Sequence, residues 1–179
     1  MKLQFWSFDV VFSMVVFSGA LMLLTLVWYN QSNQFSSTYG LEVLSIQAQL
    51  LSLQNRIMMQ GSPYNWYSVL NAADKATWSN ISIGIGTGIG NNISTSRLDA
   101  LMSIASFNYT SYQNSKQMLG IGYDYLLNIT GTNIHILIGR NPAAFNATSV
   151  QTASMPIFIE GNPANMKIEL WTNTTLGVS

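Results

Sequence analysis

The chain contains no cysteine among its 179 residues, which excludes disulfides, thiolate metal sites and cysteine nucleophiles. Charge is also scarce: only 8% of the residues are charged, against roughly 25% in an average soluble domain. The seven basic residues balance the seven acidic ones, so the formal net charge is zero. A neutral, charge-poor chain has no electrostatic footprint for nucleic acid, and we expect no such partner. The polar surface must come from Asn, Ser, Thr, Gln and Tyr, and it suits hydrogen bonding, close subunit packing or glycans.

Sequence features of an enzyme are few. His135 is the one histidine, and it lies within the strand-like "IHILIG", where a structural role and an acid–base role are both open. The acidic residues are scattered singly, and no nucleophile or metal-ligand motif is present. The glycine-rich "ISIGIGTGIGNN" fits neither spacing of a phosphate-binding loop and is interpreted as a short strand and a flexible turn. We therefore expect no catalytic residue, no cofactor and no metal site, and the chain is not predicted to be an enzyme.

A long apolar run extends from Phe5 to about Tyr29 and defines residues 1–29 as a predicted membrane anchor. Its centre, "VVFSMVVFSGALMLLTLVWY", has no charge, and about twenty helical residues cross a bilayer core. Aromatic residues at both ends resemble interfacial belts. A cleaved secretory signal is the competing interpretation, but the run is too long and no A-x-A-like site follows it. Lys2, together with the initiator amine, favours a cytoplasmic N-terminus and an extracellular C-terminal domain.

Glycosylation sequons support an extracellular domain, because all of them follow the apolar run. Passive generation by an Asn- and Thr-rich composition is the alternative explanation. The candidate asparagines are Asn30, Asn80, Asn92, Asn108, Asn128, Asn146 and Asn173.

Residues 30–60 are predicted to form a polar neck and an amphipathic helix. In "LEVLSIQAQLLSLQNRIMM" the apolar positions follow a heptad, and these positions are Val43, Ile46, Leu50, Leu53 and Ile57. Such a stripe can pack on its own domain or be shared between subunits. If the neck is helical, one helix of roughly 80 Å runs from Phe5 to Met59, although Gly40 weakens it by about 1 kcal/mol.

Residues 61–179 are predicted to form a small α+β domain. "STSRLDALMSIAS" is expected to be a helix with Leu98, Leu101, Met102 and Ala105 on its apolar face, and "YTSYQNSKQMLG" a second helix stopped by Gly120. Four alternating segments follow: "YDYLLNIT", "IHILIGR", "MPIFIE" and "MKIELW". The turns "GTN" and "GNPAN" join them into two hairpins. We expect an antiparallel sheet with one face covered by helix.

The N-terminal segment "KLQFWSFDVVFS" resembles the N-termini of archaeal type IV pilin-like proteins, which have class III (prepilin-type) signal sequences. In that family a basic residue and Gly precede Gln, Ser, an acidic residue and a long apolar helix, and Lys2, Gln4, Ser7 and Asp9 follow this order. "GSPYNW", "STSRLDALM", "NYTSYQNSKQMLGIGYDY" and "IELW" are similar to the ectodomains of this group. The resemblance therefore covers most of the chain.

The resemblance implies a filament mechanism. A prepilin-type peptidase would cut between Leu3 and Gln4, and the apolar helix would enter a filament core as a homo- or hetero-oligomer with other pilin-like subunits. Asp9 would then pair with the terminal amine of a neighbouring subunit, because an unpaired carboxylate in an apolar core is costly. Asp9 lying simply among lipid headgroups is the alternative.

Two functions follow from these features. The first is a major or minor subunit of a surface filament. The second is a single-pass membrane protein that never polymerises and acts as an accessory or scaffold subunit of a surface complex. Asp9 and the heptad favour the first function. Leu3, which stands where the family usually has Gly, and Gly40 favour the second.

Overall fold

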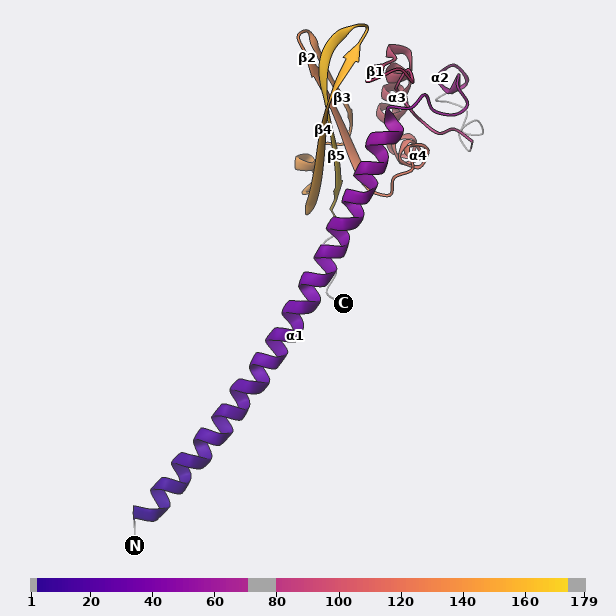
Figure 1. Ribbon diagram of the computed structural model, residues 1–179. Helices are drawn as coiled ribbons and strands as arrows, with labels where there is room; N and C mark the ends of the chain where they lie inside the picture. The colour runs from indigo at the N-terminus through magenta and orange to yellow at the C-terminus, as the bar shows by residue number, and fades with distance from the viewer. Residues whose placement is uncertain (1–2, 71–79, 174–179) are drawn as a thin grey trace. The chain divides into compact units, whose positions relative to one another are not determined.

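One long helix, α1 (Leu3–Ile57), forms the N-terminal part of the chain (Figure 1). It belongs to a computed structural model that describes residues 3–70 and 80–173. The helix continues through Gly40, as predicted on the condition that the neck is helical, and it ends before the first proline of the sequence, Pro63. The absence of proline over this range leaves its backbone hydrogen bonds uninterrupted.

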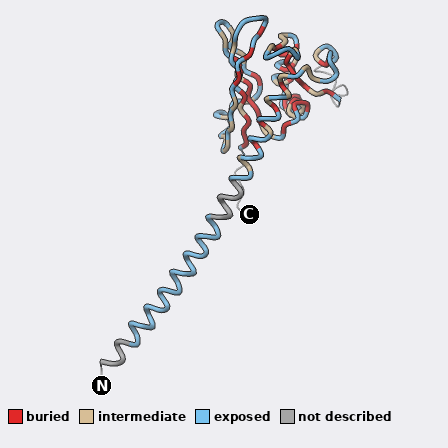
Figure 2. The backbone as a smooth tube through the Cα atoms, in the orientation of Figure 1, coloured by how far each residue is buried: buried red, intermediate tan, exposed pale blue. Residues whose placement is uncertain are grey.

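The chain divides into two compact units, Met1–Glu42 and Val43–Ser179. In the first unit, all residues from Phe8 to Ser32 are exposed, whereas buried residues gather in the helices and sheet of the second unit (Figure 2). The second unit is therefore the part of the chain with its own core.

The second unit is built on a five-stranded sheet in the order β1-β4-β5-β2-β3. Its strands are β1 (Asn92–Ile93), β2 (Asp124–Gly131), β3 (Ile134–Gly139), β4 (Ser149–Ile159) and β5 (Asn162–Thr172). The hairpins β2–β3 and β4–β5 confirm the two predicted hairpins and the α+β class. The prediction of a purely antiparallel sheet is wrong, because β1 pairs in parallel with β4. A strand of two residues is too short to show an alternating pattern, so "NNIS" was indistinguishable from a turn.

The β4–β5 turn is tighter than the predicted "GNPAN" loop. Glu160 and Gly161 form it, with φ angles of 52° and 83°, and two positive φ angles suit the twist of a two-residue hairpin. Pro163 lies within β5 opposite Phe158. Proline has no N–H to donate, but no hydrogen bond between β5 and β2 is lost, because the pairing of these two strands begins only at Ala164.

The described part of the unit also contains helices α2 (Trp66–Val69), α3 (Thr95–Phe107) and α4 (Tyr109–Leu119), with a 3₁₀ helix, η2, at Pro142–Phe145. Asn108 caps α4 by accepting a hydrogen bond of 2.8 Å from the Ser111 amide, and Gly120 ends it in the left-handed region. The predicted apolar face of α3 was partly wrong. Met102 is exposed, whereas Ile104 is buried, because the helix turns the side chains of Leu98, Leu101 and Ile104 inward.

The core joins the second half of α1 to one face of the sheet. Four of the five predicted heptad positions, Ile46, Leu50, Leu53 and Ile57, are buried in a single cluster with sheet residues such as Leu127 and Ile168. Val43 is only half-buried. Each fully buried side chain of this kind contributes roughly 2 kcal/mol, so this stripe is a main attachment of α1 to its own domain.

The glycine-rich segment closes over the end of α1. The amides of Ile85 and Gly86 donate to the Ile57 carbonyl at 2.8 and 3.1 Å, and the Gly86 amide also donates to Met59 at 3.0 Å. These bonds satisfy carbonyl groups that a helix end leaves without partners. A β carbon on Gly86 would lie 1.7 Å from the Met58 carbonyl oxygen, and one on Gly84 would lie 2.3 Å from that of Met59. The Gly-x-Gly pattern thus reflects a close approach of two backbone segments. The prediction of a short strand here is wrong, because the segment before β1 forms only isolated bridges at Ser82 and Gly86.

Replacing Gly86 by alanine should lower the free energy of unfolding of the second unit by about 3 kcal/mol, since backbone must move to admit the methyl group. Denaturant unfolding of the full chain in detergent, followed by tryptophan fluorescence, measures the change. Gly40→Ala is the matched control, because a β carbon there meets nothing within 4 Å. It should leave this transition unchanged. Equal transitions for Gly86→Ala and the wild type would contradict the close approach.

Candidate functional site: the N-terminal helix and its attachment

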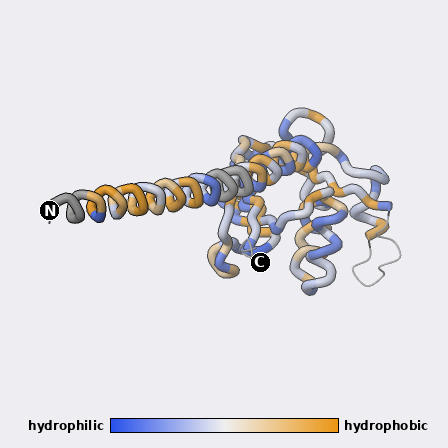
Figure 3. The backbone as a smooth tube through the Cα atoms, turned by 90° about the horizontal axis from the view of Figure 1, so that it is seen from below, coloured by the Kyte–Doolittle hydropathy of each residue, from blue (hydrophilic) through white to orange (hydrophobic). Residues whose placement is uncertain are grey.

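The first half of α1 is long and apolar enough to cross a membrane. The segment is Phe8–Ser32, with 25 residues, all of them exposed. Figure 3 shows that this part of the helix is mostly hydrophobic. Two of its hydroxyl groups return to the helix backbone: Ser13 donates to the Asp9 carbonyl and Thr25 to that of Leu21, both at 2.7 Å. These two hydroxyls are therefore satisfied without water, as an apolar environment requires.

The predicted processing residues lie at the start of this helix. Leu3 and Gln4 are the first residues of α1. Asp9 is exposed, and its carboxylate forms no ion pair with any residue that the structure describes. The carboxylate therefore lies exposed at the N-terminal edge of the apolar segment.

The second half of α1 has three faces. Opposite the buried stripe, Leu44 and Leu51 are 61% and 62% exposed. On a flank, Gln49 accepts a hydrogen bond of 2.9 Å from the Gly122 amide, and Arg56 donates one of 3.1 Å to the Leu119 carbonyl. The heptad therefore packs on its own domain, and a second apolar strip is left uncovered by the described chain.

Arg97 and Trp66 brace the end of α1. The Trp66 indole donates to the carbonyls of Gln60 and Gly84, both at 3.2 Å. Arg97 is 3% exposed and donates to the carbonyls of Gly86 and Tyr64, and its guanidinium lies 4.9 Å from the Tyr64 ring centroid. Sequence reasoning missed this role, because nothing in "STSR" distinguishes a buried arginine from an exposed one.

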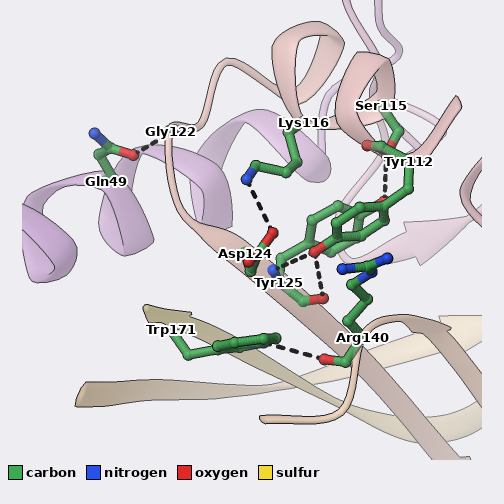
Figure 4. Close-up of polar contacts among 9 residues, drawn as sticks. All are labelled: Gln49, Tyr112, Ser115, Lys116, Gly122, Asp124, Tyr125, Arg140 and Trp171. Atoms are coloured by element: carbon green, nitrogen blue, oxygen red, sulfur yellow. Dashed lines mark hydrogen bonds and ion pairs between the residues drawn. The ribbon is translucent and has the colours of Figure 1, made fainter. Parts of the chain in front are cut away.

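A tyrosine pair joins α4 to β2 (Figure 4). The Tyr112 and Tyr125 rings stack at 5.3 Å, and the Tyr112 hydroxyl accepts a bond of 2.9 Å from the Tyr125 amide. The Ser115 hydroxyl donates to the Tyr112 carbonyl at 2.6 Å, so at 2.8 Å it accepts from the Tyr125 hydroxyl. Lys116 and Asp124 form an ion pair of 2.9 Å beside the rings.

Burial raises the pKa of both phenols well above the usual value of a tyrosine. The rings therefore remain neutral over the physiological range. Because both Tyr112 and Tyr125 already have hydrogen-bond partners within the protein, we interpret the cluster as structural.

His135 is exposed on β3. Within residues 3–70 and 80–173, no group of three or more histidine or acidic side chains is placed to hold a metal ion. The described residues therefore form no such group around His135.

The sequons differ in their surroundings. Asn146 is exposed in a left-handed turn after η2, and Asn80 and Asn173 are also exposed. The other four are less suited: Asn30 lies inside the apolar segment, Asn108 caps α4, Asn92 donates to the Ile89 carbonyl, and Asn128 lies in the middle of β2 with its Oδ1 buried.

Comparisons with protein families, curated proteins and solved structures find no match to this chain. Function is therefore inferred from its own residues and geometry. The features that bear on function are the uncovered apolar helix, its single carboxylate and the exposed leucines of α1.

The stability of the second unit should fall as pH rises above about 10, the ordinary pKa of tyrosine. The unfolded chain then loses the Tyr125 proton that the native state keeps, so this residue removes up to about 1.4 kcal/mol per pH unit. Denaturant unfolding from pH 8.5 to 11 measures the slope. Tyr125→Phe should lower the slope by this amount and leave the part that the similarly buried Tyr112 contributes.

Ser115→Ala is the control for this pH effect. It deletes the hydroxyl that accepts from Tyr125 but keeps both phenols, so stability should fall by about 1 kcal/mol at every pH with the slope unchanged. An unchanged slope in Tyr125→Phe would show that Tyr125 does not cause the pH effect.

Proposed function

We propose that this chain is a pilin-like subunit, major or minor, of an archaeal cell-surface filament, and that the first half of α1 anchors it in the membrane before assembly. The observation that supports this function is the Phe8–Ser32 segment, whose apolar side chains have no cover from the described chain. A bilayer covers such a segment before assembly, and neighbouring helices cover it in a filament core.

Asp9 favours a filament over a plain anchor. A carboxylate carried into an apolar helix core is costly unless a positive group meets it. The described chain supplies no such partner for Asp9. A terminal amine on a neighbouring subunit, created by cleavage between Leu3 and Gln4, has the required charge and would fix the register of adjacent helices.

The proposed topology has the N-terminus in the cytoplasm and the second unit outside the cell. Lys2, together with the initiator amine, provides the positive N-terminal flank. The charge-poor polar surface of the second unit, with exposed sequons at Asn80, Asn146 and Asn173, is compatible with an extracellular, glycosylated domain.

A non-polymerising accessory subunit is the second candidate, and Leu3 is the observation that favours it. Prepilin-type peptidases prefer a small residue before the cut, and leucine is not small. Without cleavage, no new amine forms at Gln4, and Asp9 loses its proposed partner.

Asp9→Asn should abolish incorporation into filaments while leaving membrane insertion unchanged, because the neutral amide cannot pair with a terminal amine. Incorporation is measured by electron microscopy and by immunodetection of the chain in sheared surface fractions. Intact mass of the mature protein shows whether residues 1–3 are removed. Asp99→Asn, at an exposed position on α3, is the matched control and should assemble normally. A mature protein that begins at Met1 and occurs only in membranes would establish the accessory function instead.

Glycan occupancy should follow sequon exposure in protein isolated from its native surface. Asn146 should be modified, because its side chain is exposed in a turn, and Asn128 should not, because β3 and β5 flank it on both sides. Glycopeptide mass spectrometry measures both sites in one sample. Modification of Asn128 with an unmodified Asn146 would contradict the proposal.

A further inference from the structure

The edge strand β4 carries unpaired backbone groups along its first half. The Phe158 amide points away from β5, because it donates to the Asn91 carbonyl at 2.9 Å. Strand residues alternate in direction, so the N–H and C=O groups of Val150, Thr152 and Ser154 also point away from β5. No described residue bonds these outward groups, because β1 pairs only with Phe158 and Ile159.

The opposite edge, β3, offers the same pattern. The Arg140 amide donates to the Tyr125 carbonyl of β2 at 2.9 Å. By alternation, the backbone groups of His135, Leu137 and Gly139 point outward, and within the described chain no strand pairs with them. Both edges thus present a short row of outward residues.

Neither edge carries the usual protection against strand pairing. Soluble proteins place charges, proline or bulges on exposed edges. No residue of Ser149–Ile159 or Ile134–Gly139 is charged. Pro156 blocks β4 only beyond Ser154. At the other end, the Thr148 amide is already bonded to the Thr172 carbonyl. The open stretch of β4 is therefore bounded at Val150 and Ser154, and it matches the length of the open stretch of β3.

The direction of the strands makes the two edges complementary. From β4 to β3 every neighbouring pair is antiparallel, so β3 runs opposite to β4. A second copy placed beside the first, with the same face of its sheet outward, continues the antiparallel ladder. Leu137, which is 53% exposed, then lies against Thr152 and buries part of its side chain.

We propose that β3 of one copy pairs with the first half of β4 of the next, so that the sheet continues from subunit to subunit. The contact is heterologous, because two different edges meet, and it therefore extends without closing into a dimer. It deepens the proposed filament function by supplying a contact between the second units. It does not depend on cleavage at Leu3 or on Asp9.

The absence of cysteine allows a direct test with paired cysteines. In the full-length double variant Leu137→Cys and Thr152→Cys, both side chains lie on the same outward face of the sheet. Within one copy the two positions are separated by β5 and β2, about 14 Å at the usual strand spacing, beyond the reach of a disulfide. Mild oxidation of the chain in native membranes, followed by non-reducing electrophoresis, should give a ladder beyond the dimer.

The single variants Leu137→Cys and Thr152→Cys are the controls, and each should remain monomeric. Dimers in the Thr152→Cys variant would show a closed β4–β4 pairing and overturn the proposal. Monomers in the double variant would overturn it as well. Adding Thr152→Pro to a second pair that the same register places opposite each other, His135→Cys with Ser154→Cys, should abolish cross-linking, since proline removes one outward N–H without touching the β4–β5 ladder.

Two further comparisons separate this contact from the proposed function. A ladder in an Asp9→Asn background, with no filaments on cells, supports the edge contact and shows that it forms without helix assembly. Filaments that assemble from the double variant without any cross-link overturn the edge contact while the filament function stands.

Discussion

The close backbone contact between the end of α1 and residues 84–86 is the constraint on which the second unit depends. Helix α1 contributes the stripe from Ile46 to Ile57 to the core, and its last carbonyls are satisfied by the amides of Ile85 and Gly86. Only glycine allows this approach, because a β carbon at residue 86 would lie 1.7 Å from the Met58 carbonyl oxygen. The contact also positions the Gly86 carbonyl for Arg97. Residues 84–86 therefore close the end of the helix, accept a hydrogen bond from the buried Arg97 guanidinium, and lead into the segment that precedes β1.

Much of this fold was predictable because its sequence patterns are local. The heptad predicted the buried stripe of α1, Gly120 marked the end of α4, and the alternating apolar residues on either side of "GTN" predicted the β2–β3 hairpin. In each case the residues that form the pattern lie within one element. The apolar segment was equally clear, because no charge interrupts it between Asp9 and Glu42.

The features that were missed depend on neighbours that are distant in sequence. β1 is a strand only because β4 lies beside it, and Arg97 is buried only because Tyr64 and Gly86 offer carbonyls to it. The first half of β4 is rich in Ser, Thr and Gln, so its alternation of small and polar residues gives little periodic contrast. Of the candidate site, the sequence gives the position of Asp9, but its proposed partner belongs to another molecule.

The scarcity of charge and the uncovered surfaces both make contact with a second copy of the chain less costly. In the described chain, α1 exposes the apolar side chains of Leu44 and Leu51. The edge strands β3 and β4 carry no charged residue that would repel a second copy. Charged residues on these surfaces would keep a monomer soluble. A surface of Ser, Thr, Asn and Gln instead desolvates at lower cost than a charged one, and its hydrogen bonds can transfer from water to a neighbouring subunit. If the chain functions as proposed, low surface density in the membrane would allow such surfaces before assembly, and close packing in the filament would then turn them into contacts.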